Sequence, residues 1–213
     1  MQASVVILAG ALAAIAGFVD AVGYLQFSRL FVSFMSGNTT VLGIHAANAE
    51  WTAAVEPALA IAGFVLGAFV GALITGPAGR WAMAAVCGLE AALLAAALAA
   101  LASGVPPALS LLPITVAMGM QNIPLSRIGE TRVAMTYVTG ALVNLGRMLG
   151  QVVQRRASWR PSLTHALLWG ALLCGAVAGG LTHGRIGFLA LAVPAVLLAL
   201  IGAVMAAATW RDR

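Results

Sequence analysis

The chain has 213 residues, of which 62% are hydrophobic and only 8% are charged, and its mean hydropathy is +1.02. A soluble globular domain carries roughly 25% charged residues, so this composition excludes a soluble fold and indicates an integral membrane protein. The net charge of +5 comes from eleven arginines without a lysine. In a membrane protein such arginines chiefly set orientation, so we expect no nucleic-acid partner.

Eight apolar runs follow one another along the chain, each close to the about 20 residues that a spanning helix needs. They cover residues 4–28, 30–48, 57–79, 81–102, 105–126, 133–154, 161–181 and 186–210. The loops between them are too short for a soluble catalytic or nucleic-acid-binding module. We therefore predict one all-α transmembrane domain over residues 1–213, a polytopic helical bundle with seven or eight membrane segments. The first run has no preceding basic residue and no cleavage site, which favours a first helix over a signal peptide.

The two halves of the chain repeat each other, with repeat one at about 4–102 and repeat two at about 105–210. A shift of about 102 to 108 positions aligns Asp20 with Asn122, Ser36-Gly37 with Thr139-Gly140, Gly67 and Gly71 with Gly175 and Gly179, and Gly79-Arg80 with Gly184-Arg185. Duplicated membrane domains tend to place their polar, helix-breaking segments face to face near the bilayer midplane, where a transported solute binds.

The repeats are either parallel, with four crossings each, or inverted, with a re-entrant or broken segment in each half. Eight full spans divide the arginines 5 to 6 between the two sides. An inverted arrangement with the N-terminus outside places eight arginines inside, Arg29 and Arg80 among them, and three outside, namely Arg127, Arg132 and Arg185. Because cytoplasmic loops carry an excess of basic residues, we expect inverted repeats with broken helices.

The first polar motif lies inside an apolar run. Gly37 is followed by Asn38 and Thr39, whose side chains compete for backbone hydrogen bonds, so we predict a helix break that lines a polar cavity. Thr136, Thr139 and Gly140 form the counterpart in the second half. The alternative is that the hydroxyl groups bond back to their own helix and that glycine permits close packing.

Two acids, Asp20 and Glu90, are embedded in apolar runs. An ionised carboxylate there costs several kcal/mol unless it is paired, hydrated or protonated. Asp20 is either a proton acceptor, cation ligand or substrate contact, or a buried partner of an arginine such as Arg29 or Arg147. Its repeat mate Asn122 lacks the charge, so any coupling is expected in the first half. Glu90 either has a direct function or bonds to a neighbouring helix.

Other polar residues carry weaker expectations. Gln121 and Asn122 end an apolar run and could line a cavity mouth, while Arg147 lies two helical turns after Gly140 and either contacts an anion or snorkels to the interface. Three histidines, His45, His165 and His183, have no second ligand at helical spacing. No nucleophile elbow or phosphate-binding loop is present, so we expect no metal, no cofactor and no enzyme.

The motifs at residues 17–21, 35–38, 119–122 and 136–140 resemble those of the YoaK family of bacterial inner-membrane proteins, whose function is unknown. That family's pattern is Gly-x-x-Asp-Ala, Met-Thr-Gly-Asn, Gly-x-Gln-Asn and Thr-Tyr-x-Thr-Gly, and Ser36 replaces its threonine but keeps the hydroxyl. The resemblance covers almost the full chain. It implies a bacterial multi-pass protein of the inner (plasma) membrane and implies no substrate.

These features together predict a secondary transporter or facilitator of a small polar solute, with an anionic group favoured. Its site residues are expected to be Asp20, Ser36, Gly37, Asn38, Thr39, Gln121, Asn122, Thr136, Thr139 and Gly140, with Arg147 as an anion contact. The expected partners are the solute and membrane lipid, and a homo-oligomer is left open. The alternative is a non-transporting membrane scaffold or accessory subunit.

Overall fold

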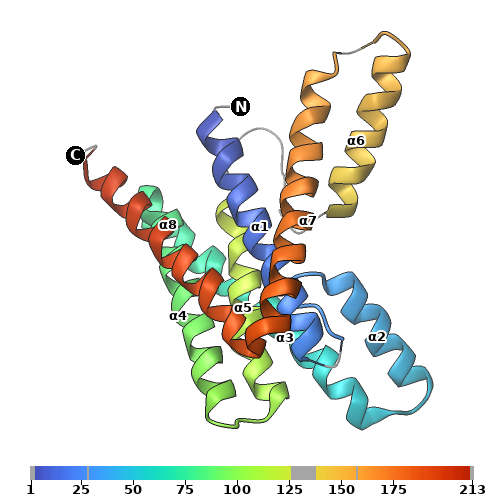
Figure 1. Cartoon of the computed structure of the whole chain (residues 1–213), viewed down its shortest axis with the longest axis vertical. Coiled ribbons are helices and arrows are strands. Elements are labelled where there is room, and N and C mark those ends of the chain that lie inside the picture. The colour runs from blue at the N-terminus through green and yellow to red at the C-terminus, as the bar shows by residue number, and fades with distance from the viewer. Residues whose placement is uncertain (1–2, 28, 126–137, 157, 212–213) are drawn as a thin grey trace.

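The computed structural model describes residues 3–27, 29–125, 138–156 and 158–211. Within these ranges the protein is a bundle of helices without a strand, as predicted (Figure 1). The α-helices are α1 (Ala3–Gln26), α2 (Met35–Ala47), α3 (Trp51–Ala78), α4 (Ala82–Ala102), α5 (Pro107–Leu125), α6 (Val138–Val153), α7 (Arg160–Ile186) and α8 (Ala192–Arg211). Two short 3-10 helices, η1 (Gly79–Trp81) and η2 (Gly187–Leu191), precede α4 and α8.

Three continuous helical stretches are long and apolar enough to cross a membrane: Val6–Gln26, Trp51–Ala102 and Ser162–Arg211. The second has 52 residues, which at 1.5 Å per residue would measure about 78 Å as one straight helix. That is more than twice the about 30 Å of a hydrocarbon core. The chain reverses at η1 and η2 instead, so both longer stretches hold two α-helices. The count of seven or eight membrane segments stays a prediction.

Both reversals begin at a glycine in the left-handed backbone region, Gly79 with φ 53° and Gly187 with φ 58°. A Cβ at either position would meet nothing within 4 Å, so the backbone conformation alone requires glycine. The two glycines are 108 residues apart, which is also the separation of Gly67 and Gly175. The predicted alignment of Gly79 with Gly184 is therefore wrong by three residues, because Gly184 still lies inside α7.

Glycines bring α1 and α7 into backbone contact. A Cβ on Gly17 would lie 2.1 Å from the Leu172 carbonyl oxygen, and one on Gly175 would lie 1.9 Å from that of Ala14. Such close approach is how helices associate in lipid, where van der Waals packing replaces the hydrophobic effect. The two helices run in the same direction, and they form the most extensive helix pair of the bundle (Figure 1).

The pair α3 and α5 is built in the same way. A Cβ on Gly119 would lie 2.1 Å from the Phe64 carbonyl oxygen, and one on Gly67 would lie 2.0 Å from that of Val116. These two helices are also parallel to each other, but they run opposite to α1 and α7 (Figure 1). Each half of the chain thus contributes one helix to each pair.

The helix directions give the bundle two ends. The N-terminal end holds the starts of α1 and α7, the reversal η1 and the end of α8, where the Trp81 and Trp210 rings lie 6.5 Å apart. The opposite end holds η2, the α2–α3 turn at residues 48–50 and the α4–α5 turn at residues 103–106.

The arginines of the described residues are unevenly divided between these ends. Arg80, Arg155, Arg156, Arg160 and Arg211 belong to the N-terminal end, whereas Arg29 follows α1 and Arg185 lies in the last turn of α7, both at the opposite end. Arg147 lies within α6 and is counted with neither end. The expected arrangement, with Arg29 and Arg80 on one side, is therefore wrong. Its physical reason is the length of α2, which with 13 residues extends only about 20 Å and does not carry the chain across the bundle.

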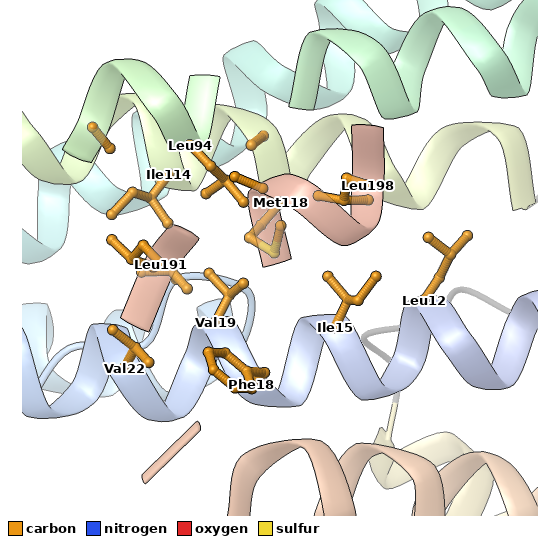
Figure 2. Packing of buried hydrophobic residues seen from close by; sticks show 14 of the residues in the cluster. Leu12, Ile15, Phe18, Val19, Val22, Leu94, Ile114, Met118, Leu191 and Leu198 are labelled. Atoms are coloured by element: carbon orange, nitrogen blue, oxygen red, sulfur yellow. The ribbon is translucent and has the colours of Figure 1, made fainter. Parts of the chain in front are cut away.

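The apolar core lies where α1, α4, α5, α8 and η2 meet (Figure 2). Val19 of α1, Leu94 of α4, Met118 of α5 and Leu198 of α8 are all fully buried there. These contacts join the α1/α7 pair to the α3/α5 pair through α4 and α8. Helices α2 and α6 lie outside this core, each at the side of the bundle (Figure 1).

Candidate functional site

Asp20 holds the loop that joins α1 to α2. Its Oδ1 atom accepts hydrogen bonds from the backbone N–H groups of Val32 at 2.9 Å and Ser33 at 2.8 Å, and the Ser33 hydroxyl donates to Oδ2. Val32 and Ser33 are buried, so water does not replace the carboxylate. Gly23, one turn along α1, leaves room for the loop, because a Cβ there would lie 2.6 Å from Val32 Cγ1.

Asn38 holds the same loop from the other side. Its Oδ1 accepts a hydrogen bond from the backbone N–H of Phe31 at 3.0 Å, and its Nδ2 donates to the backbone carbonyl of Phe31 at 2.6 Å. The Asn38 side chain is fully buried, and a buried backbone group must find such a partner. The structure therefore brings Asp20 and Asn38 together, each bound to the segment 31–33.

The remaining residues of the first motif belong to the first two turns of α2. The irregular backbone lies before them, at residue 27 and residues 29–34, rather than within the motif as predicted. The hydroxyl of Thr39 donates to the Met35 carbonyl at 2.8 Å, which is the back-bonding that formed the alternative reading. Gly37 packs under the Phe31 ring, since its Cβ would lie 3.0 Å from that ring, and Ser36 is exposed.

A pocket of about 400 Å³ lies beside Asp20, between α1, α7 and the loop, and we call it the Asp20 pocket. Asp20 and Tyr24 are among the residues that line it, and its α7 wall includes Ala176, but the surface that faces the cavity is apolar. The Tyr24 and Phe31 rings that line it lie 5.1 Å apart. The Asp20 oxygens are bonded to the loop, so the pocket offers a solute chiefly ring and other apolar contacts.

The predicted site residues of the second half lie elsewhere. Gln121 is buried on α5 and donates from Nε2 to the Leu12 carbonyl of α1 at 3.3 Å, so it joins the two helix pairs. Asn122 donates from Nδ2 to the Met118 carbonyl of its own helix at 2.8 Å. Thr136 lies outside the described residues.

Thr139, Gly140 and Arg147 are on α6, which among the described elements packs only on α7. Arg147 is exposed and donates to the Asn144 side chain at 3.3 Å. Helices α2 and α6 do not contact each other. The structure therefore does not bring the two polar motifs together within the part of the chain that it describes.

Sequence reasoning missed a polar pocket, of about 500 Å³, between α2 and α3. It is lined by His45, Thr52 and Glu56 together with apolar residues. The His45 Nδ1 atom lies 2.6 Å from Glu50 Oε2. The sequence signal for this pair is a histidine followed five residues later by an acid. That spacing brings the two side chains together only because α2 ends between them, at Ala47.

Glu90 has no bond to a neighbouring helix. It is fully buried on α4, and neither carboxyl oxygen has a hydrogen-bond partner among the described residues. The alternative that this acid merely bonds across the bundle is therefore wrong. The two embedded acids differ sharply, because the Asp20 carboxylate accepts three hydrogen bonds and that of Glu90 accepts none.

Comparison with known proteins places this fold in a family. The family described as "Protein of unknown function (DUF1275)" matches residues 8–204. The chain belongs to this family. A "UPF0700 transmembrane protein RA0705" of Rhizobium meliloti (strain 1021) is 35% identical over 210 residues, which cover 97% of this chain and 89% of that protein. A "UPF0700 transmembrane protein YoaK" of Bacillus subtilis (strain 168) is 27% identical over 194 residues, 86% of each chain.

The resemblance to the YoaK family is thus confirmed. The relatives in the DUF1275 family are transmembrane proteins by name, which agrees with the three membrane-length helical stretches. The chain is therefore a membrane protein. No solved structure matches the chain.

Proposed function

We propose that this DUF1275 protein is a multi-pass secondary transporter or facilitator of a small polar solute in the bacterial inner membrane. The observation that carries the proposal is that each of the two parallel helix pairs contains one helix from each half of the chain. Gly17 of α1 packs on α7 as Gly119 of α5 packs on α3. At both crossings a Cβ on the glycine would lie 2.1 Å from a carbonyl oxygen of the partner helix. Two units of the same build that run in opposite directions are typical of transporters with inverted repeats.

The short helices α2 and α6 support the same proposal. Each follows one helix of a parallel pair and packs on another, and α2 follows an irregular segment held by Asp20 and Asn38. Irregular backbone at membrane depth is tolerated where it is buried in protein or lines a cavity. The Asp20 pocket adjoins this segment, and we take it as the solute site. The anionic preference expected from Arg147 has no support in the described geometry.

The orientation follows from the arginines. Of the eight in the described residues, five belong to the N-terminal end, two belong to the opposite end, and Arg147 lies within α6. Since basic residues gather on the cytoplasmic side, we place the N-terminal end in the cytoplasm and the α2–α3 turn outside. This reverses the expected N-terminus-outside orientation, because that expectation let α2 cross the membrane.

Solute flux into proteoliposomes tests the proposal. The purified protein is reconstituted and exposed to a panel of labelled small polar solutes, with protein-free liposomes as the baseline. Ala176→Phe should fill the Asp20 pocket and abolish the flux of any solute that the wild type carries. The matched control is Val177→Phe, because the neighbouring Val177 is 55% exposed on the outer face of α7 and the change leaves the pocket open.

A membrane scaffold or accessory subunit is the second candidate. The observation that favours it is that Asp20 and Asn38, the strongest motif residues, are already bonded to the chain's own loop. Flux that exceeds the baseline and is blocked only by Ala176→Phe would exclude this candidate. Equal flux from all three proteins and from empty liposomes would support it.

A further inference from the structure

Glu90 lies in the middle of the buried face of α4. That face consists of Met83, Val86, Cys87, Glu90, Leu94 and Ala97, and it packs on α5 and α8. Leu94, one turn after Glu90, belongs to the same apolar cluster as Met118 and Leu198 (Figure 2), while Cys87, one turn before it, lies beside Gly202 of α8. Glu90 is thus enclosed by apolar side chains and is fully buried.

Within the described residues, no charged group lies on the helix faces that pack against this carboxyl. Helix α5 and the 3-10 helix η2 contain no ionisable residue. Helix α8 contains one, Arg211, at its last position. Arg80 lies at the start of η1 and Glu56 in the second turn of α3. The nearest titratable group on α4 itself is Cys87. Because burying an unpaired carboxylate costs several kcal/mol, Glu90 carries a proton in this arrangement.

The packing around α4 is not matched in the other half. Helix α4 packs along α5, whereas α8, its counterpart in the second half, barely touches α1. In place of that contact there is an apolar groove of about 450 Å³ between α1, α7 and α8, lined by Ala11, Phe18, Cys174 and Ile201 among others. The helix α8 therefore has room to close on α1.

The structure assigns a proton-binding site to Glu90, which reaches water when α8 closes on α1 and α4 separates from α5. In that open state the carboxylate takes one proton from water, and the return of α4 buries the neutral acid. The next opening returns the proton to water. This inference rests on the proposed transport function and makes that transport pH-dependent. The four-residue turn at 103–106 restricts separation to the part of α4 away from the turn, where Glu90 lies.

Infrared spectroscopy of the full chain in lipid nanodiscs tests the protonation without a transported solute. At neutral pH the wild type should show the carbonyl stretch of a protonated carboxylic acid, and Glu90→Gln should lose it. Asp20→Asn removes the other embedded acid and should keep the band. If Glu90→Gln is poorly folded, Glu90→Leu fills the same volume without a polar atom and should lose the band as well. The absence of the band in the wild type would overturn the inference.

Cross-linking tests the change in access. Ala11→Cys and Ile201→Cys, in a chain with Cys87→Ala and Cys174→Ala, place one thiol on each side of the groove. A short cross-link should hold α8 on α1 and speed the hydrogen–deuterium exchange of the Glu90 band by about tenfold or more. A long cross-linker between the same thiols is the control and should leave the exchange slow. Equal exchange with both linkers would overturn the coupling.

The two proposals fail separately. Solute flux with no Glu90 band would retain the transporter and remove the proton site, as would flux whose pH dependence is unchanged in Glu90→Gln. A band that exchanges faster with the short cross-link, in a protein that carries no solute of the panel, would retain the proton site and refute transport of those solutes.

Discussion

Replacement of Asp20 by alanine should destabilise the protein far more than replacement by asparagine. Asp20→Ala leaves the buried backbone N–H groups of Val32 and Ser33 without an acceptor. An unsatisfied buried donor costs about 1–3 kcal/mol, so the two together should cost about 2–6 kcal/mol. Asp20→Asn keeps an Oδ1 acceptor for both N–H groups and loses only the contribution of the charge, about 1–3 kcal/mol for two bonds.

The free energy of unfolding in mixed detergent micelles, followed by the loss of helical circular dichroism, measures both variants. Asn38→Asp provides a further comparison, because it removes the donor to the Phe31 carbonyl while it leaves the Asp20 bonds in place. If Asp20→Ala and Asp20→Asn were equally stable, or if both matched the wild type, the carboxylate would not be what holds the α1–α2 loop.

Two further predictions concern the packing and the orientation. Gly175→Ala should lower the free energy of unfolding by about 1–3 kcal/mol through overpacking, since its Cβ would lie 1.9 Å from the Ala14 carbonyl oxygen. Gly180→Ala, inside the same helix with nothing within 4 Å of its Cβ, should raise it by up to about 1 kcal/mol, and equal effects in thermal unfolding would refute the argument. Ala49→Cys should react with a membrane-impermeant thiol reagent added to intact cells, whereas Arg155→Cys should react only after the membrane is opened. The reverse pattern would invert the proposed orientation.

The glycines show how far local sequence reaches. Glycines four residues apart, as Gly67 and Gly71 or Gly175 and Gly179 are, form a pattern typical of close helix contact, and Gly67 and Gly175 do lie against a neighbouring backbone. The sequence could not say which helix would be met, because any helix with a matching surface satisfies the pattern. In the folded chain α1 pairs with α7 and α3 pairs with α5, so each helix has its partner in the other half. The sequence pattern does not contain this information.

The polar motif shows why the predicted site was less accurate than the predicted fold. Gly37, Asn38 and Thr39 disfavour a continuous helix by propensity, yet the helix begins at Met35 and includes them. The preceding loop takes the irregular conformation because Asp20 and Asn38 supply its hydrogen bonds. A partner 12 or 13 residues away in a loop, as Val32 and Ser33 are for Asp20, has no periodic signature that a sequence pattern could carry.

The two embedded acids looked alike in sequence, and the supply of hydrogen-bond donors separates them. Asp20 faces a loop whose backbone amides would be unpaired without it, so its charge is offset and its loss should be felt as instability. Glu90 faces helices whose amides are already used within their own turns, so no donor is left for its oxygens. Glu90 therefore stabilises nothing in the observed conformation. Its carboxyl group either lowers the stability of the protein or serves a second conformation, such as the proposed open state. Glu90→Leu should therefore stabilise the resting protein, as replacement of buried unpaired polar groups often does, while it removes the pH dependence of transport.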